Sequence, residues 1–257
     1  MADAARAWFT PQVEVLRLDA QTNGCDAAHP TTSRLVTSVT RHTLRGMPID
    51  GRTAHEESLF VVLSGTPDVE AGIEEWPRRG TRTSPFEGPP VVLFVPRRTG
   101  FRFLGGHAEF VRFTARLPGD EPTRVAVDDD DDDLADPTDP TREAHLPQIL
   151  LPRHFDDAAC GDVRVRRLVR DDYRSRVLAL QEAVVEANCT WSVATPEDAE
   201  VVAFVRTDAE IHASSNGVVA RIRGDGVVRA AGGRPLTFRC DTGRAYVVVC
   251  SARDKRS

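Results

Sequence analysis

The C-terminal part of the chain carries few side chains that can exchange a proton with a substrate. His212 is the only histidine in the final hundred residues, and the carboxylates Asp198 and Glu200 come shortly before it. Imidazole and carboxylate groups can act as general acid and base, removing a proton from one carbon and returning it to the next. Glu200, His212 and Asp198 are therefore the candidate catalytic residues.

Other motifs that carry chemistry are absent from the sequence. Lys255 is the only lysine, which nearly excludes chemistry through a lysine Schiff base. The five cysteines are widely spaced and form no C-x-x-C pair, so the sequence supports neither a structural zinc site nor a disulfide framework. No phosphate-binding glycine loop, dinucleotide fingerprint or G-x-S-x-G nucleophile elbow occurs.

Short apolar or alternating runs, cut by Gly, Pro and Arg-Arg, make up most of the chain. They lie at residues 13–18, 35–44, 58–65, 91–95, 101–113, 163–169, 201–206, 217–222 and 245–249. Runs of this length that are rich in Val and Phe are typical of strands in an antiparallel barrel or sandwich. The apolar content of residues 174–185 is compatible with a strand or a helix. No long helix is expected elsewhere.

The turns between residues 58 and 116 are more specific than the strands. One apolar run ends in Leu63-Ser64-Gly65, and the turn Phe86-Glu87-Gly88-Pro89-Pro90 leads into the run 91–95, which a Pro-containing turn closes. This order resembles the N-terminal half of the 5-deoxyglucuronate isomerase and 5-keto-4-deoxyuronate isomerase family. The resemblance implies an all-β bicupin, with two antiparallel jelly-roll barrels in one chain.

The resemblance also implies a division of the chain into halves. We expect residues 1–117 to form an N-terminal cupin barrel and residues 142–257 to form a C-terminal one. Residues 118–141 lie between them, are rich in Pro and Asp, and contain the run Asp128–Asp133. Like charges extend such a segment, so an exposed loop or linker is expected. A calcium site is the alternative, but the spaced ligands and turning glycine of such a site are missing.

The second half keeps part of a segment that the family resemblance places near the substrate. Family members carry Gly-Asn-Trp-Ser-Ser here, and this chain has Asn188, Trp191 and Ser192, with two residues inserted between Asn188 and Trp191. These three residues and Tyr246 are the candidate substrate-binding residues. For Trp191, packing in the core is the alternative to lining a sugar pocket.

The resemblance implies a divalent metal, but the sequence departs from the ligand pattern. In the family, a His-x-His pair after this segment, a Glu and a later His hold the metal that steadies an enediolate. Here residues 193–200 contain no histidine, only Glu200 matches, and residues 236–249 offer no imidazole. A degenerate metal site and no bound cofactor are therefore expected. In the first half, His55 beside Glu56 comes nearest to a cupin metal motif, and a solvated loop end is its alternative.

Two functions from different classes remain open at this point. The first is an isomerase-like cupin that acts on a keto-sugar, a uronate or a similar polar metabolite, by proton transfer through Glu200, His212 or Asp198. The second is a diverged, non-catalytic cupin that serves as a binding or assembly module. Loss of several metal ligands at once favours the second, because such a site loses most of its affinity.

Composition limits the partners. The net charge is -6, and the run Asp128–Asp133 supplies all of it, so no basic surplus is available to bind nucleic acid. The N-terminus lacks a signal segment and no apolar run reaches membrane-spanning length. We expect a soluble cytoplasmic protein with a small sugar-like ligand and no membrane partner. Open sheet edges often pair, so a homodimer is expected.

Overall fold

The computed structural model describes residues 13–16, 18–20, 25–28, 35–116, 147–169, 178–230 and 233–253. Within these ranges the elements are β-strands, apart from the short 3-10 helix η2 (Pro152–His154). No helix in this part of the chain has the length and apolar character needed to cross a bilayer. The all-β class is confirmed, whereas the expected linker 118–141, with its Asp run, lies outside the described residues.

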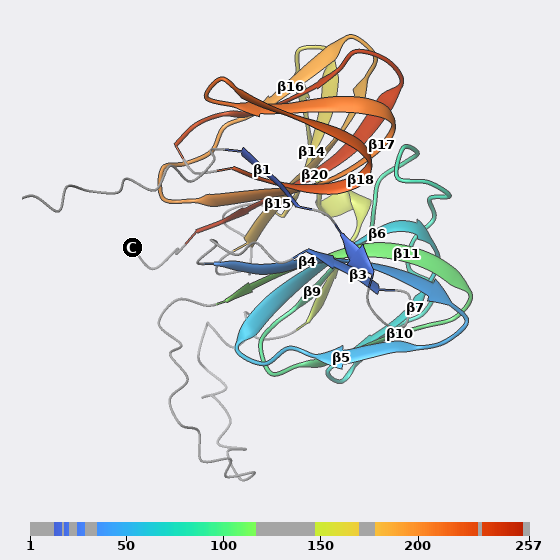
Figure 1. Ribbon diagram of the computed structural model, residues 1–257. Coiled ribbons are helices and arrows are strands. Elements are labelled where there is room, and N and C mark those ends of the chain that lie inside the picture. The colour runs from blue at the N-terminus through green and yellow to red at the C-terminus, as the bar shows by residue number, and fades with distance from the viewer. Residues whose placement is uncertain are drawn as a thin grey trace, which may run out of the picture.

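The first half of the chain forms two antiparallel sheets, drawn mainly in blue and green in Figure 1. The strands of the first sheet are β2 (Asp19–Ala20), β3 (Cys25–Ala28), β4 (Val36–Arg45), β6 (Glu56–Gly65), β9 (Val92–Val95), β11 (His107–Arg116) and β12 (Gln148–Leu150). Their order in space is β12-β9-β6-β11-β4-β3-β2. The strands of the second sheet are β5 (Ile49–Arg52), β10 (Gly100–Leu104), β7 (Asp68–Ala71) and β8 (Glu74–Trp76), in that spatial order.

The second half forms one nine-stranded antiparallel sheet that curls round its own core. The strands along its main path are, in spatial order, β1 (Val13–Leu16), β18 (Val218–Ala230), β17 (Glu200–Ser215), β20 (Arg244–Ala252), β15 (Leu178–Glu186), β14 (Val163–Val169) and β13 (Asp156–Cys160). Off this path, β16 (Cys189–Val193) pairs with β19 (Leu236–Cys240), which also pairs with β17. The ambiguous segment 174–185 therefore contributes a strand.

The two halves exchange one edge strand each. β1 pairs with β18, with Val13 opposite Ala230 and Leu16 opposite Val227, and in Figure 1 the blue β1 lies among the orange strands of the second half. β12 pairs with β9 of the first half. The expected boundaries 1–117 and 142–257 follow the order of the sequence, whereas each of these two strands pairs with a strand on the other side of them. Local periodicity identifies a strand but not the sheet that it joins.

Strands at the centre of the molecule contribute to two different cores. Leu59, Val61 and Leu63 of β6 pack in a central core between the halves, whereas Phe60 packs inside the N-terminal barrel. On β17, Val202 and Phe204 face the central core, and Val201 and its odd-numbered neighbours face the interior of the C-terminal barrel. Successive side chains of a strand point to opposite faces, so these strands are apolar throughout because both faces are buried.

The Leu63-Ser64-Gly65 end of β6 requires a glycine. Gly65 has φ of +86°, and a Cβ added there would lie 2.2 Å from the backbone carbonyl oxygen of His107 on β11. A side chain at this position would meet both a left-handed backbone and a fixed backbone atom. The close approach of β6 to β11 thus explains this part of the motif in physical terms.

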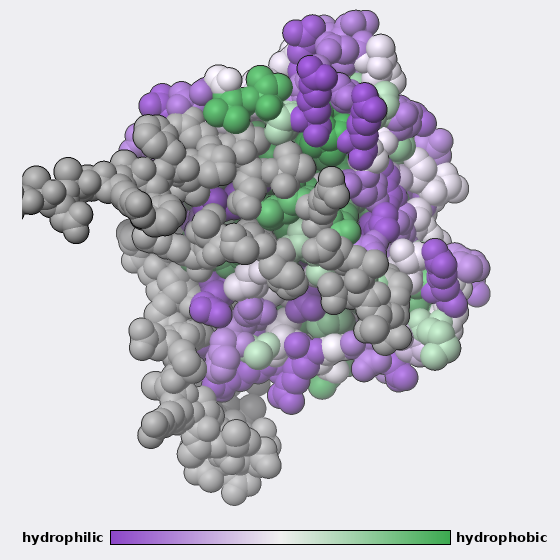
Figure 2. Space-filling view, in the orientation of Figure 1, coloured by the Kyte–Doolittle hydropathy of each residue, from purple (hydrophilic) through white to green (hydrophobic). Residues whose placement is uncertain are grey.

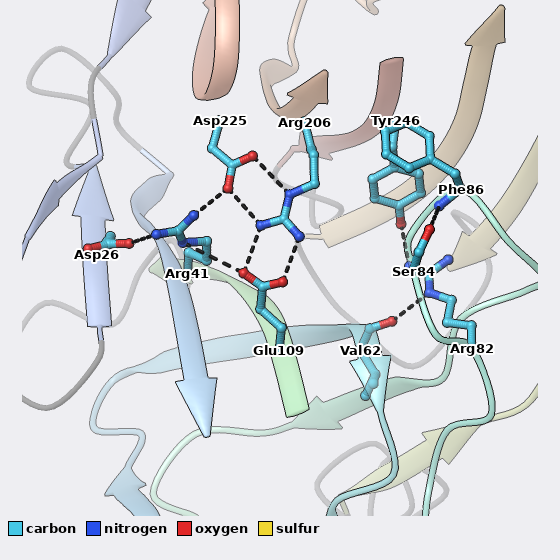
Figure 3. A network of polar contacts seen from close by, with 10 residues as sticks. All are labelled: Asp26, Arg41, Val62, Arg82, Ser84, Phe86, Glu109, Arg206, Asp225 and Tyr246. Carbon is cyan, nitrogen blue, oxygen red and sulfur yellow. Dashed lines mark hydrogen bonds and ion pairs between the residues drawn. The ribbon is translucent and has the colours of Figure 1, made fainter. Parts of the chain in front are cut away.

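A network of partly buried ion pairs joins the halves beside the central core (Figure 3). The Arg206 guanidinium of β17 donates to both carboxylate oxygens of Glu109 on β11, at 2.6 and 2.7 Å, and also to Asp225 on β18. Arg41 on β4 donates to Asp225 and to Asp26. Bidentate arginine–carboxylate bonds fix both distance and angle, so this network sets how the two sheets face one another.

The arginines also determine the ionisation of the Asp225 carboxylate. Burial opposes its negative charge, but hydrogen bonds and charge from Arg206 and then Arg41 outweigh burial and lower the pKa of Asp225. A carboxylate whose pKa is lower in the folded than in the unfolded state stabilises the fold above its unfolded pKa. That stabilisation is lost as the pH falls through the folded-state value.

We predict that Arg206→Met lowers the free energy of unfolding by about 1–3 kcal/mol, because Glu109 and Asp225 then lose charged donors in a partly buried site. The measurement is urea denaturation followed by circular dichroism. Arg223→Met is the matched control, since Arg223 pairs with Glu210 at an exposed surface and its loss should change stability very little. Equal effects of the two substitutions would contradict the structural role of the network.

We predict that Asp225→Asn destabilises the protein at neutral pH and that its difference from the wild type shrinks as the pH falls below about 4. The reason is that protonation of Asp225 removes from the wild type the same charge that the variant lacks. Urea denaturation at a series of pH values between neutral and acid measures this. A difference that stayed constant over the acid range would show that the Asp225 charge does not contribute.

Candidate functional site

A cavity of about 650 Å³ opens into the C-terminal barrel. β16 contributes Trp191, Ser192 and Val193 to its wall, β15 contributes Gln181, and β14 contributes Arg167. On the remaining side, the wall is formed by Cys160, Ser251 and Arg253, together with small apolar residues. The volume lies in the range of small-molecule sites, about 300–1,000 Å³.

Strand pairing fixes the polar and aromatic wall of this cavity. Trp191 lies opposite Phe238 of β19, and the two rings stack with centroids 5.9 Å apart. The next pair is Ser192 opposite Thr237, whose hydroxyl oxygens lie 2.8 Å apart. Trp191 is only 2% exposed, so it serves as core and as cavity wall at once. Lining a pocket and packing in the core, the two alternatives that the sequence left open for Trp191, are therefore compatible.

The cavity has a positive charge pattern. Arg167 and Arg253 line it, whereas no Asp, Glu or His is among the described residues of its wall. Ser192, Ser251 and Gln181 add hydroxyl and amide groups that can donate or accept hydrogen bonds. Guanidinium groups bind carboxylates in a bidentate manner. The arrangement is therefore suited to a hydroxylated anion.

Arg167, Ser251 and Arg253 line the cavity but were not among the candidates chosen from the sequence. The alternation of side chains along their strands could have identified them. Val163 and Val165 face the interior of the C-terminal barrel, and Arg167 follows them at the same spacing on β14. Likewise, Ser251 and Arg253 continue the interior face that Val249 occupies on β20. A polar residue on the apolar face of a strand is the signal, because that face otherwise points into the core.

The structure does not bring the three candidate catalytic residues together. The Glu200 carboxylate accepts bonds from the backbone N–H groups of Leu35, at 2.9 Å, and Val36, at 3.2 Å, at the start of β4. His212 lies twelve residues further along the same strand, a separation of up to about 40 Å at roughly 3.3 Å per residue. Asp198 is exposed in the turn before β17. None of the three lines the cavity.

His212 lies in an ion-pair group of its own at the far end of β17. Its Nε2 is 3.1 Å from a carboxylate oxygen of Glu210, and its Nδ1 is 3.6 Å from Asp241. Glu210 also accepts a bond from Arg223. The hydrogen bond from Arg223, then that from His212, lowers the pKa of Glu210. These contacts account for His212 as part of a surface ion-pair group.

The candidate substrate-binding residues fall into two groups, those that line the cavity and those that lie elsewhere. Trp191 and Ser192 line the cavity, whereas Asn188 and Tyr246 do not. Asn188 is exposed in the turn between β15 and β16, with φ of 63°, and its N–H donates to the carbonyl of Cys240 at 2.7 Å. Asparagine tolerates this left-handed conformation better than most residues, so the turn itself explains the residue.

Tyr246 belongs to a buried polar network next to the central core. Its hydroxyl donates to Glu182 at 2.5 Å and accepts from Arg82 at 2.9 Å, and the Arg82 guanidinium lies 5.0 Å from the tyrosine ring centroid (Figure 3). Arg82 also donates to the carbonyl of Val62 on β6, and Arg166 donates to Glu182. Burial, as the main cause, raises the pKa of Tyr246 well above its usual value. The network joins the halves, because Arg82 belongs to the first half and Glu182 and Tyr246 to the second.

The Phe86–Pro90 turn contacts the second half of the chain. The guanidinium of Arg244 lies 4.4 Å from the centroid of the Phe86 ring, and Arg166 donates to the carbonyl of Gly88 at 3.3 Å. The Ser84 hydroxyl accepts a bond from the Phe86 N–H and shapes the turn (Figure 3). The most specific motif of the first half therefore contributes to docking of the halves.

The residues present do not fit the divalent metal that the family resemblance implies. Within the described part of the chain, no three His, Cys, Asp or Glu side chains gather into a group that could hold a metal ion. Among the described residues that line the cavity, Cys160 is the only one of these types. Stable divalent sites use three or more such ligands.

Comparison with known proteins gives a family and a fold. Residues 18–134 match the model of the KduI/IolB family. The resemblance predicted from the Leu-Ser-Gly and Phe-Glu-Gly-Pro-Pro segments is thus confirmed. The sequence has no match among curated proteins. The KduI/IolB match ends before the C-terminal barrel begins, so it does not include the cavity.

Solved structures resemble the whole chain. An IolB-like protein from Salmonella typhimurium LT2 has a TM-score of 0.72 at 15% identity, covering 93% of this chain and 92% of that one. A protein from Geobacillus kaustophilus has a TM-score of 0.65 at 10% identity, with 96% of each chain covered. Quercetin 2,3-dioxygenase from Acinetobacter baumannii has a TM-score of 0.63 at 9% identity, covering 95% and 79%. At these identities the likeness establishes the cupin fold.

We predict that Tyr246→Phe lowers the free energy of unfolding by about 1–3 kcal/mol, because the buried Glu182 carboxylate loses a donor. Urea denaturation measures the change. Ligand affinity in the C-terminal cavity should be unchanged, because the hydroxyl lies in the network beside the central core. A variant of wild-type stability with weakened ligand binding would instead support the substrate-binding role expected from the sequence.

Proposed function

We propose that this chain is a diverged KduI/IolB-type cupin whose C-terminal barrel binds a carboxylated sugar such as a uronate. Arg167 and Arg253 are positioned to hold the carboxylate, and Ser192, Ser251 and Gln181 to bond sugar hydroxyls. The observation that carries the proposal is the charge pattern of the cavity, with two guanidinium groups and no carboxylate among the lining residues that the structure describes. Trp191, almost fully buried and stacked on Phe238, supports this wall from the core side.

A binding role is favoured over isomerisation by the same lining residues. Moving a proton between adjacent carbons requires a base within about 3 Å of the carbon-bound proton. In the described part of the chain, neither an imidazole nor a carboxylate lines the cavity, and Glu200, His212 and Asp198 lie in three separate environments. Arginine remains protonated in proteins and is a poor base. The cavity therefore has the groups for recognition but lacks the usual ones for proton transfer.

Isomerisation of a keto-sugar or uronate is the second candidate, because the KduI/IolB match and the Trp191–Ser192 wall both favour it. Proton NMR of the protein with 5-deoxyglucuronate distinguishes the two functions. We expect the sugar spectrum to stay unchanged over many hours while the sugar binds. Conversion to a ketose, lost in a cavity variant, would favour the enzyme.

We predict that glucuronate binds measurably in isothermal titration calorimetry and that glucose, which lacks the carboxylate, binds at least tenfold more weakly. Arg167→Met should weaken glucuronate binding about tenfold or more, because one charge-assisted contact contributes roughly 1.5–3 kcal/mol. Arg164→Met is the matched control, since Arg164 lies on the same strand outside the cavity and pairs with Asp157. Equal binding of glucose and glucuronate would contradict the proposal.

The thiol of Cys160 provides an independent measure of where the ligand sits, because it lines the cavity. Bound glucuronate should slow alkylation of Cys160 by iodoacetamide, followed by peptide mass spectrometry. Cys25, inside the other barrel, is the internal control. Slowing at neither cysteine in the presence of bound sugar would place the ligand elsewhere.

A further inference from the structure

Two cysteines that are far apart in the sequence lie directly opposite one another in the C-terminal barrel. Cys189 is the first residue of β16 and Cys240 is the last residue of β19, and the antiparallel register pairs them. The other cysteines of the chain lie opposite residues of other types: Cys25 opposite His42, Cys160 opposite Val163, and Cys250 opposite Leu180 and Val202. Neither the KduI/IolB match, which ends at residue 134, nor the proposed function involves this pair.

The pairing places both thiol side chains on one face of the sheet. Residues directly opposite one another on antiparallel strands point to the same side, with Cα atoms about 4.5–5.5 Å apart. A disulfide needs Cα atoms roughly 4.4–6.8 Å apart, so the strands already hold the two backbones at a suitable spacing. The burial of the side chains points the same way, because Cys240 belongs to the apolar core of the barrel and Cys189 packs against that core.

Hydrogen bonds fix Cys240 on both sides. The N–H of Asn188, in the turn before β16, donates to the carbonyl of Cys240 at 2.7 Å. On its other side β19 pairs with β17, which places Ile211 opposite Cys240. Both cysteines are free thiols, and the thiol of Cys240 donates to the carbonyl of Thr242 at 3.1 Å. A thiol is a weak donor, so oxidation of this sulfur removes only a weak hydrogen bond.

The two thiols differ in their access to a reagent. Cys189 is partly exposed, and in the described part of the chain its strand β16 pairs only with β19. Cys240 is 0% exposed, and burial, followed by the charge of Asp208, raises the pKa of its thiol. Attack on a disulfide requires an accessible thiolate. A small oxidant therefore reacts at Cys189 first, and Cys240 reacts afterwards from within the protein.

We propose that Cys189 and Cys240 are a redox modification site that forms a reversible cross-strand disulfide between β16 and β19. The oxidant is a small organic disulfide, such as oxidised glutathione. The Cys189 thiolate attacks one of its sulfurs, which forms a mixed disulfide and releases one glutathione. The Cys240 thiolate then attacks the Cys189 sulfur and releases the second glutathione. Two electrons pass from the protein to the oxidant, and the two released glutathione molecules take up the two thiol protons.

The disulfide locks the strand pair that forms one wall of the cavity. Trp191 and Ser192 follow Cys189 on β16 and line the cavity, so a bond at Cys189 prevents their strand from separating from β19. The bond also closes a long loop of the chain, which restricts the unfolded state. In a reducing compartment the thiols stay free, so the lock forms only when an oxidant is present. The proposal is independent of what the cavity binds.

Peptide mapping of the whole protein tests the bond. The protein is equilibrated with oxidised glutathione at pH 8, free thiols are alkylated with iodoacetamide in denaturant, and a tryptic digest is read by mass spectrometry without reduction. Trypsin cuts after Arg206 and Arg239, so the two cysteines leave in separate peptides. We expect a linked Cys189–Cys240 pair that dithiothreitol separates, with the other three cysteines alkylated. Absence of this link, or a link from either residue to another cysteine, would overturn the proposal.

Urea denaturation tests the lock. Oxidation should raise the unfolding midpoint of the wild type by roughly 1 M, and dithiothreitol should reverse the shift. Cys189→Ser should have the same midpoint under both conditions, and Cys240→Ala provides the same comparison if Cys189→Ser does not fold. Cys160→Ser is the matched control, because Cys160 is a partly buried thiol packed against the same core, and it should keep the shift. An unchanged wild-type midpoint, or a shift that persists in Cys189→Ser, would overturn the proposal.

Discussion

The structure depends on the burial of both faces of its central strands. Along β6, β11, β17 and β20, alternate residues belong to two different cores, one between the halves and one inside a barrel. A shift of one residue in register would exchange these two sets of side chains completely. In β6 it would bring Phe60 into the central core and Val61 against the phenylalanines. The pairing of the strands and the docking of the halves are therefore fixed together.

This constraint gives the arginines of the molecule two kinds of environment. Those on the central faces, such as Arg206 and Arg82, meet carboxylates from other strands, because a charge between two packed sheets has little access to water and needs a partner from the protein. Arg167, by contrast, is exposed on β14 and lines the cavity of the C-terminal barrel. The same residue type therefore joins the two halves in one place and forms a cavity wall in another.

The sequence predicted the strands well but not their partners. Runs such as 58–65 and 91–95 are apolar throughout, which is typical of strands buried on both faces, and the Phe86–Pro90 turn identified the family. The exchange of β1 and β12 depends on which distant edge is open, and periodicity within one segment does not encode this. Of the candidate substrate-binding residues, Trp191 and Ser192, which sit on a recognisable segment, lie in the cavity wall. Glu200 and His212 were chosen by residue type, which takes no account of their distance along one strand.

The parts of the chain that resemble the KduI/IolB family are those that build the architecture. The Leu63-Ser64-Gly65 end allows β6 to approach β11, and the Phe86–Pro90 turn contacts Arg166 and Arg244 of the other half. Changes there would disturb docking of the two halves, whereas changes on a cavity wall alter only what the cavity binds. A barrel can therefore keep its fold while the side chains that line it differ. The KduI/IolB match includes residues that dock the halves, whereas the residues that line the cavity lie outside it.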